Sequence, residues 1–257
     1  MNWLLLKNSL LVSSFTTLLA LGFGFLAALW LACLPSRWQS RFLALAVIAL
    51  ALPPFLVTNC WLHYLGHTGV WQGWLPLNLF SLGGTVWILS LLLWPITLLA
   101  VWSAWHRLEP AQLESDMAVT GWALIRALLW PLARPALVQA AVLTFVLALN
   151  NFAVPALLQV KVSPAEIWVH FSTSFDTLGA LVLSWPLVLG PLLLLLRFSR
   201  REFPWPRREA PVAPKLLRQQ LGRAWFGASG VATLLLCVLS VGLPLFQLLA
   251  LHRTWTE

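Results

Sequence analysis

Long apolar runs recur along the chain, and each is long enough to cross the ~30 Å hydrocarbon core of a bilayer as a helix. Only 9% of the residues are charged, whereas a soluble domain carries about 25%. The sequence therefore predicts an all-α, polytopic membrane protein with about six transmembrane helices. The predicted spans cover residues 9–34, 42–65, 79–104, 136–158, 177–196 and 224–251.

The basic residues are distributed unequally between the two sides of these spans. Lys7, Lys161 and Arg253 fall on one side. The other thirteen of the 16 Lys and Arg residues fall on the opposite side: Arg37, Arg41, Arg107, Arg126, Arg134, Arg197, Arg200, Arg201, Arg207, Arg208, Lys215, Arg218 and Arg223. Loops rich in Lys and Arg stay in the cytoplasm, so the thirteen residues predict the cytoplasmic side, and both termini face outward. The net charge of +8 is thereby explained without nucleic acid as a partner.

Residues 200–223, "RREFPWPRREAPVAPKLLRQQLGR", are basic and rich in proline, unlike the sequence before them. Such a composition is typical of a linker between folded units. We therefore expect three parts: a core of five spans over residues 1–199, a cytoplasmic linker over 200–223, and an additional transmembrane helix within 224–257.

The predicted spans contain no Asp, Glu, Lys or Arg in their interiors. Ion-driven carriers usually hold ionisable groups there, although backbone carbonyls of broken helices can also bind Na⁺. No catalytic motif or phosphate-binding loop is found, so the sequence predicts no enzyme and no cofactor. If the helices transport a solute, the energy comes from another protein.

No metal site is expected either. Cys33, Cys60 and Cys237 lie in apolar runs without the spacing of metal ligands. His63 and His67 are four residues apart, but a metal would need further ligands, and two histidines at the membrane interface are the favoured interpretation. Six tryptophans fall near predicted span ends, where amphipathic rings prefer to lie: Trp38, Trp71, Trp74, Trp102, Trp105 and Trp255.

One loop is polar although it lies between two apolar spans. Residues 108–121, "LEPAQLESDMAVTG", hold three of the eight acidic residues, Glu109, Glu114 and Asp116. Acidic residues suit the start of a helix. Leu113, Met117, Leu124 and Leu128 recur at helical spacing and form one apolar stripe. Gly121 permits a bend, and Pro131 and Pro135 are expected to end the segment before the fourth span. An amphipathic helix lying on the membrane surface is an alternative interpretation.

This loop and the following residues, "LLWPLARPALVQAAVLTFVLALNNFAVPALL", resemble the cytoplasmic loop and next helix of binding-protein-dependent ABC importer permeases. "NSLLVSSFTTLLALGFGFLAALWLA", "LALPPFLVTNCWLHYLG" and "AEIWVHFSTSFDTLGALVLSWPLVL" resemble other core helices of that family, in its iron(III), thiamine and polyamine-like branch. The resemblance covers most of residues 8–200. It implies the ABC importer permease (MetI-like) fold with a cytoplasmic coupling helix.

The resemblance also implies the partners and the site. The loop, about residues 105–135, would dock into the ATP-hydrolysing subunit, which acts as a dimer. A periplasmic solute-binding protein would deliver the solute to a permease in the inner membrane, and a second permease half would complete the path through the bilayer. The coupling residues would be Glu109, Leu113, Glu114, Asp116, Met117, Gly121, Leu124 and Pro131. Asn150 and Asn151 are candidates for the translocation path, although hydrogen bonding between helices is the favoured role for both.

The chain departs from the family pattern at the loop. Ser115, Asp116 and Met117 stand where the family has Glu-Ala-Ala, and Glu114 lies one residue early. Gly121 precedes Pro131 by ten residues instead of thirteen, a difference of about one helical turn, or ~4.5 Å. These departures keep a second hypothesis open, in which the chain is a degenerate, non-transporting scaffold with the permease fold. A secondary carrier or channel is a third.

The order of the segments suggests one permease half followed by the beginning of another. The last 31 residues, "GASGVATLLLCVLSVGLPLFQLLALHRTWTE", resemble the extra first helix that precedes the core of a half in this branch. The expectation is a split gene product, a truncated relative or a fragment, with another permease half supplying the second coupling loop.

Overall fold

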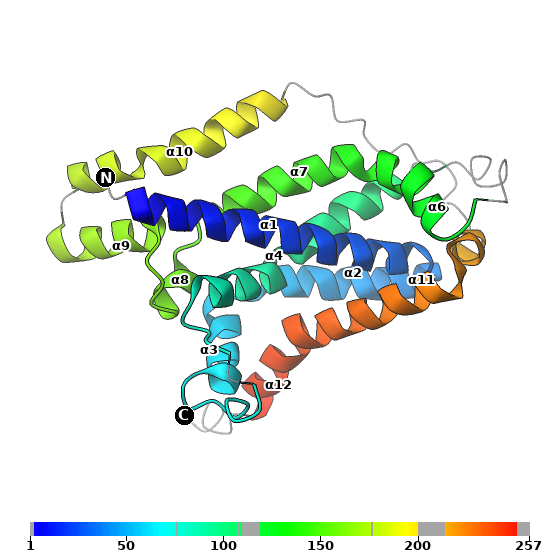
Figure 1. Cartoon of the computed structure of the whole chain (residues 1–257), viewed down its shortest axis with the longest axis horizontal. Helices are drawn as coiled ribbons and strands as arrows, with labels where there is room; N and C mark the ends of the chain where they lie inside the picture. Colours follow the sequence, from blue (N-terminus) through cyan, green and yellow to red (C-terminus); the bar gives the residue numbers. More distant parts are fainter. Residues whose placement is uncertain are drawn as a thin grey trace.

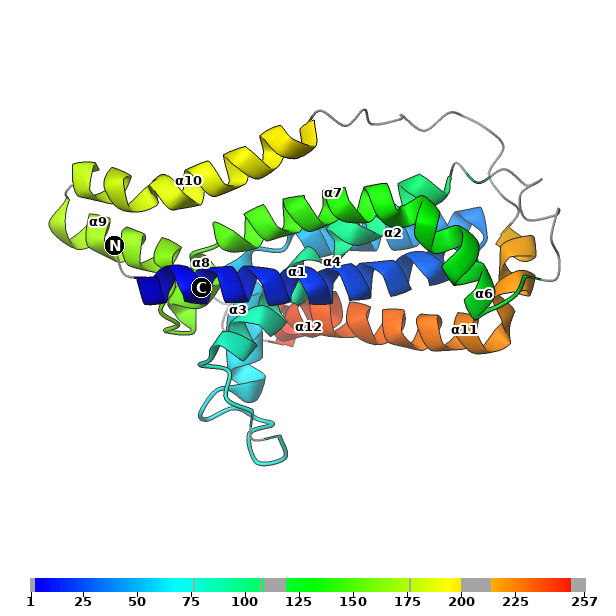
Figure 2. The same cartoon turned by 45° about the horizontal axis from the view of Figure 1, so that its top comes forward.

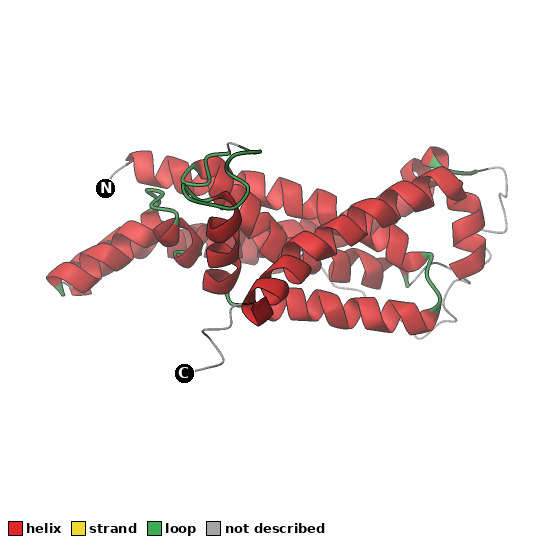
Figure 3. Ribbon diagram, turned by 90° about the horizontal axis from the view of Figure 1, so that it is seen from below, coloured by secondary structure: helices red, strands yellow, loops and turns green. Residues whose placement is uncertain are grey.

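The computed structural model describes residues 3–75, 77–106, 108, 119–175, 177–199 and 214–250. All regular elements within these ranges are helices (Figure 3). They are α1 (Trp3–Ala32), α2 (Ser36–Ala51), α3 (Pro54–Leu65), α4 (Leu82–Trp105), α6 (Trp122–Leu124), the π-helical η1 (Ile125–Leu129), α7 (Trp130–Leu149), α8 (Ala153–Leu157), α9 (Ser163–Ser174), α10 (Thr177–Ser199), α11 (Pro214–Cys237), the π-helical η2 (Val238–Gly242) and α12 (Leu243–Ala250).

The helical segments are long and apolar enough for a multi-pass membrane protein, as the sequence predicts. Within the described residues, five segments can cross a bilayer, or six if α2 and α3 form one broken span. The five are Trp3–Ala32, Leu82–Trp105, Trp122–Leu149, Thr177–Leu194 and Pro214–Ala250. The predicted all-α fold with about six spans is therefore confirmed.

The second predicted span is not a continuous helix. The sequence predicts one span over residues 42–65, whereas α2 and α3 meet at an angle of 88°. Leu52 has an extended backbone, with φ −61° and ψ 130°, because the ring of Pro53 disfavours helical geometry at the preceding residue. Pro54 then occupies the first turn of α3, where a missing N–H is tolerated. As a result, α3 projects sideways from the bundle (Figure 1).

Helix α4 forms the centre of the bundle, and it packs mainly against α1 and α7. Its Trp94 is fully buried. α1 and α4 approach each other closely at Gly24, where an added Cβ would lie 2.6 Å from the carbonyl oxygen of Trp94 and would also overlap the Cβ of Thr97. Ala20 and Ala28, one helical turn to either side of Gly24, are also fully buried. This stripe of small residues lets the two backbones approach each other.

Two long helices contain a π-helical segment, and each segment is followed by a proline. η1 ends at Leu129, two residues before Pro131, and η2 ends at Gly242, two residues before Pro244. Proline lacks an N–H, and its ring clashes with the carbonyl four residues earlier in an α-helix. The wider π turn relieves that clash, so the helix continues through the proline. The expectation that Pro131 and Pro135 end the segment before the fourth span is therefore wrong, because residues 122–149 form one helical segment.

Five described basic residues from separate parts of the chain lie at one end of the bundle, which we call the basic end. It is the end where α1 finishes, α2 begins and α11 begins (Figure 2). Arg37 lies in the first turn of α2, Arg126 in η1, and Lys215, Arg218 and Arg223 in the first part of α11.

The opposite end joins the start of α1 to the connection between α8 and α9. The Asn8 side-chain amide donates to the carbonyl oxygen of Lys161 at 3.0 Å. The backbone N–H of Ser163 donates to Oγ of Ser9 at 2.8 Å. These two segments, which contain Lys7 and Lys161, thus lie together at the end of the bundle away from the basic end (Figure 1).

Candidate functional site

The end of the polar loop, residues 119–121, lies at the basic end. Of the predicted coupling residues, Glu109, Leu113, Glu114, Asp116 and Met117 lie outside the described residues. The structure places the other three, Gly121, Leu124 and Pro131, on the segment that enters α7 (Figure 2).

Gly121 marks a sharp turn of the backbone, with φ 58° and ψ −124°. This conformation favours glycine, because a Cβ makes a positive φ costly. The N–H of Gly121 donates to the carbonyl oxygen of Gln220 at 2.8 Å. The ring of Trp122 stacks on that of Trp225, with 5.5 Å between centroids and 20° between planes. The end of the loop is therefore fixed to the beginning of α11.

The beginning of α11 is shaped to receive this turn. Gly222 has φ 80° and ψ 160° inside the helix, which produces a sharp kink. Before the kink, Leu217 and Leu221 are buried against the bundle. After the kink, Trp225 stacks on Trp122 of the loop end. The kink therefore lets one helix cover the basic end and then continue as a span.

The residues after Gly121 also attach to the central helix. Leu124, Ile125 and Leu129 are buried, in agreement with the predicted apolar stripe at Leu124. The indole N–H of Trp105, at the end of α4, donates to the carbonyl oxygen of Leu129 at 2.9 Å. That carbonyl lies at the π segment, where the backbone bonding is irregular. The loop end thus contacts two spans, α4 and α11.

A pair of tryptophan substitutions tests this attachment. Trp105→Phe keeps an aromatic six-membered ring but removes the five-membered ring with its N–H, so we expect the lost hydrogen bond to lower the free energy of unfolding by about 0.5–1.5 kcal/mol beyond the loss of volume that the control shares. Trp102 is the matched control, because its indole nitrogen is buried without a hydrogen-bond partner among the described residues. Trp102→Phe should show only the effect of the lost volume in denaturant titrations of the detergent-solubilised chain. Equal losses in both variants would contradict the proposed role of the hydrogen bond.

Asn150 and Asn151 lie at the end of α7 away from the basic end. The Asn150 amide donates to the carbonyl oxygen of Val146 at 2.9 Å, within the same helix. Oδ1 of Asn151 accepts from the backbone N–H of Val154 at 3.1 Å, at the start of α8. The expected hydrogen bonds between helices are therefore replaced by local ones, because α7 ends at Leu149 and the freed backbone groups take the nearest partners. Neither residue takes part in the contacts that attach the loop end to α4 and α11.

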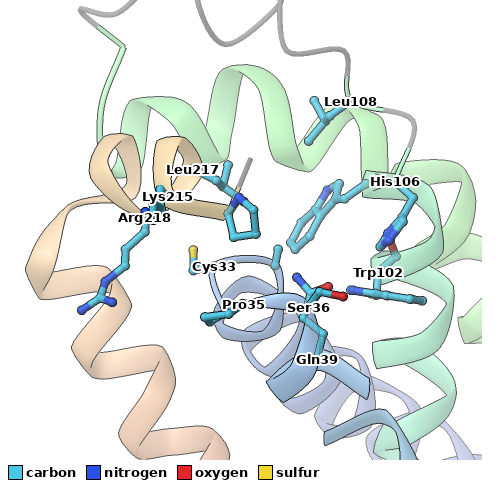
Figure 4. Close-up of a pocket in the computed structure, with 13 residues that line it drawn as sticks. Cys33, Pro35, Ser36, Gln39, Trp102, His106, Leu108, Lys215, Leu217 and Arg218 are labelled. Carbon is cyan, nitrogen blue, oxygen red and sulfur yellow. The ribbon is translucent and has the colours of Figure 1, made fainter. Parts of the chain in front are cut away.

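The basic end contains a cavity of about 480 Å³ between three parts of the chain (Figure 4). Its lining comprises the α1–α2 connection with Cys33, Ser36 and Gln39, the end of α4 with Trp102 and His106, and the start of α11. A second cavity of about 470 Å³ is lined mainly by apolar and aromatic residues, among them Trp122, Trp130 and Trp225. The stacked pair of Trp122 and Trp225 thus lies beside this second cavity.

Cys33 lies directly after α1 in the wall of the first cavity. Burial raises the pKa of its thiol to about 12, against a smaller lowering by the positive charge of Arg218. The thiol is therefore neutral at physiological pH and is a poor nucleophile.

The raised pKa predicts slow alkylation of Cys33. At pH 8 a thiol with the ordinary pKa of 9.0 is about one-tenth ionised, so a pKa about three units higher slows alkylation about a thousandfold. The rate should keep rising above pH 10. Iodoacetamide labelling of a variant that keeps Cys33 alone checks this, with cysteine at the half-exposed Trp38 as the comparison. Equal labelling rates at pH 8 would contradict a buried, neutral thiol.

Several residues of the junction could not be selected from the sequence. The sequence predicts Trp105 near the end of a span, where it lies, but it does not predict that the ring is 4% exposed or that its N–H donates to Leu129. Trp122 and Trp225 are about a hundred positions apart, and no spacing rule connects them. The sequence signal that did point here is Gly121, whose expected bend matches the observed turn.

The chain is similar in sequence and in fold to proteins of ABC transporters. No family model matches the chain. The chain is 29% identical over 176 residues to a probable molybdenum ABC transporter permease of Haloferax volcanii, and the match covers 66% of this chain and 65% of that protein. It also resembles a chain in the crystal structure of a bacterial alginate ABC transporter in complex with a periplasmic protein bound to an alginate pentasaccharide. That match has a TM-score of 0.57 and 17% identity, and it covers 77% of each chain. The chain is therefore an all-α, multi-pass membrane protein with the fold of an ABC transporter permease.

Proposed function

We propose that the chain is a transmembrane permease subunit of an ATP-driven importer. In this proposal residues 109–131 form the segment that contacts the ATP-hydrolysing subunits on the cytoplasmic side. ATP-driven closure of these subunits displaces the segment, and the spans switch the accessible side. The chain itself hydrolyses no ATP.

The attachment of the loop end to two spans carries this proposal. The N–H of Gly121 donates to the carbonyl oxygen of Gln220 in α11 at 2.8 Å, and the indole N–H of Trp105 in α4 donates to the carbonyl oxygen of Leu129 at 2.9 Å. A force on the loop would therefore move α4, the central helix, and α11 together. A helix that merely lay on the membrane surface would not require these fixed contacts to the spans.

The charge distribution supports the orientation of the proposal. The loop end lies at the basic end, beside Lys215, Arg218 and Arg223, and basic segments remain in the cytoplasm. An ATPase that uses cytoplasmic ATP must act on this side. The membrane would then be the inner membrane of a cell with a periplasm, with Lys7 and Lys161 on the periplasmic side.

The proposal includes further partners. A periplasmic binding protein would deliver the solute, in line with the bound periplasmic protein named for the alginate transporter. A second permease half would supply another coupling loop for the second ATPase subunit. In this view residues 200–223 connect two permease units, and residues 224–250, from the later part of α11 to α12, correspond to the beginning of the second.

The solute is a separate question. The sequence resemblance suggests iron(III), thiamine or a polyamine, whereas the relative from Haloferax volcanii is described as a molybdenum permease. These solutes include cations and anions, and Asn150 and Asn151 offer uncharged polar groups that fit either. We propose an importer for a small polar solute of this range.

Reconstitution tests the proposed function. The chain is incorporated into vesicles with its ATPase, a second permease half and each candidate binding protein. We expect ATP hydrolysis to rise when the loaded binding protein is added, and solute to accumulate. Stable assembly without stimulation would favour the scaffold hypothesis, and solute uptake without any ATPase would favour a secondary carrier.

A further inference from the structure

The cavity at the basic end has the size and chemistry of a binding site that the proposed transport function does not use. Its volume of about 480 Å³ lies within the range of small-molecule sites. Lys215 and Arg218 from α11 line one side, and Trp102 and His106 from α4 line another (Figure 4). No acidic side chain is among its described lining residues.

A second groove continues from the same two cations. It has a volume of about 680 Å³ and is lined by Lys215, Arg218, Gln219, Gly222, Arg223 and Phe226. The guanidinium of Arg218 lies over the ring of Phe226, 4.2 Å from its centroid, so this charge lies on the side of the second groove. Three cationic side chains therefore line this groove around the Gly222 kink.

Trp102, in the wall of the cavity, has an indole N–H without an acceptor among the described residues. Its Nε1 is buried and is not open to the cavity. A buried donor without a partner costs free energy, so a ligand acceptor that reached this N–H would be stabilised there. The Trp102 ring is held in place by His106, whose ring centroid is 4.0 Å away and whose Nδ1 lies 3.1 Å from the Trp102 carbonyl oxygen.

We propose that these two connected spaces bind a phosphate-bearing anion, with Lys215, Arg218 and Arg223 around the phosphate and Trp102 donating to an acceptor oxygen of the same ligand. The position at the end of the spans fits the headgroup of an anionic phospholipid, since basic pockets between helices on the cytoplasmic side bind such headgroups. Free phosphate has the same charged group and is the other source. Occupancy would link α1, α4 and α11 next to the Gly121 turn.

Native mass spectrometry of the purified full chain tests the proposal with phosphatidylglycerol and phosphatidylcholine as probes. We expect preferential retention of phosphatidylglycerol. Lys215→Gln with Arg218→Gln should weaken retention about thirtyfold, because each substitution removes one direct contact between a cation and the phosphate, worth about fivefold in affinity. Trp102→Phe should weaken it about tenfold through loss of the donor. Unchanged folding of this variant is read from the denaturant titration described above.

Arg37→Gln with Arg41→Gln is the matched control. It removes two charges from the basic end, but neither residue lines either space, so retention should remain within about twofold of the parent chain. Inorganic phosphate then separates the two sources. If added phosphate displaces phosphatidylglycerol, the site is assigned to free phosphate; if it does not, the site is assigned to the lipid headgroup. Equal retention of the two lipids without phosphate binding, or equal losses in both double variants, would overturn the proposal. The assay contains no ATPase, so its outcome is independent of the transport function.

Discussion

Replacing Gly24 with alanine is expected to destabilise the helix bundle by about 3 kcal/mol, near the upper end of the usual cost of overpacking. The new Cβ would lie 2.6 Å from the Trp94 carbonyl oxygen and 2.7 Å from the Leu98 backbone nitrogen. Real Cβ atoms do not approach backbone atoms so closely, so α1 and α4 would have to separate. Trp94 and Leu98 are fully buried, and the separation would therefore loosen the centre of the fold.

Gly22 provides a control on the same helix. A Cβ added at Gly22 meets nothing within 4 Å, and alanine has the higher helix propensity. Gly22→Ala should therefore match or slightly exceed the parent chain in stability. The free energy of unfolding of both variants is measured by denaturant titration in detergent micelles. Equal stabilities for the two variants would show that α1 and α4 do not approach each other at Gly24.

Replacing Gly121 with valine is expected to lower the stimulation of ATP hydrolysis in the reconstituted complex about tenfold or more. The positive φ of 58° would be strained by about 1–3 kcal/mol for a non-glycine residue. An added Cβ would already contact the Trp225 ring at 3.5 Å, and the branched side chain of valine extends further. The turn would therefore change its path, and the bond from Gly121 to Gln220 would be lost.

Gly227→Ala is the control for this variant. Gly227 lies in α11, the helix that Gly121 contacts, and a Cβ added there meets nothing within 4 Å. We expect stimulation to survive in Gly227→Ala and to fall about tenfold or more in Gly121→Val, a loss equivalent to roughly 1.4 kcal/mol of coupling. Co-purification of the ATPase with each variant separates failed assembly from failed transmission. Full stimulation in Gly121→Val would contradict a role for the turn in coupling.

The spans could be predicted because they depend on local composition. A helix crossing hydrocarbon needs about twenty apolar residues, and the runs at α1, α4 and α10 meet that condition without any knowledge of their neighbours. The break between α2 and α3 is visible as Pro53-Pro54, but its angle of 88° depends on what surrounds it. Pro131 is visible in the sequence as a residue that can end a helix, but the π-helical segment before it lets the helix continue.

The candidate site depends on contacts between distant parts of the chain, and these could not be predicted. Gly121 is recognisable as a turn residue, since glycine suits a positive φ. Its acceptor, the carbonyl of Gln220, is a backbone group that any residue could supply. The stack of Trp122 on Trp225 joins the loop to residues next to the predicted linker, where the sequence favours a simple connection. Local patterns thus locate the turn, and tertiary packing determines what it touches.

The central claim is that the polar loop before Gly121 contacts an ATPase on the cytoplasmic side. The most direct measurement uses a chain in which Cys33, Cys60 and Cys237 are replaced by serine and Met117 by cysteine. This variant is crosslinked to the ATPase subunit with and without ATP. Cysteine at Trp74, which is 90% exposed and follows α3 away from the basic end, is the control. We expect an ATP-dependent crosslink from position 117 and none from position 74. Labelling of position 117 from the periplasmic side, or an assembled complex without the crosslink, would contradict the contact between the loop and the ATPase.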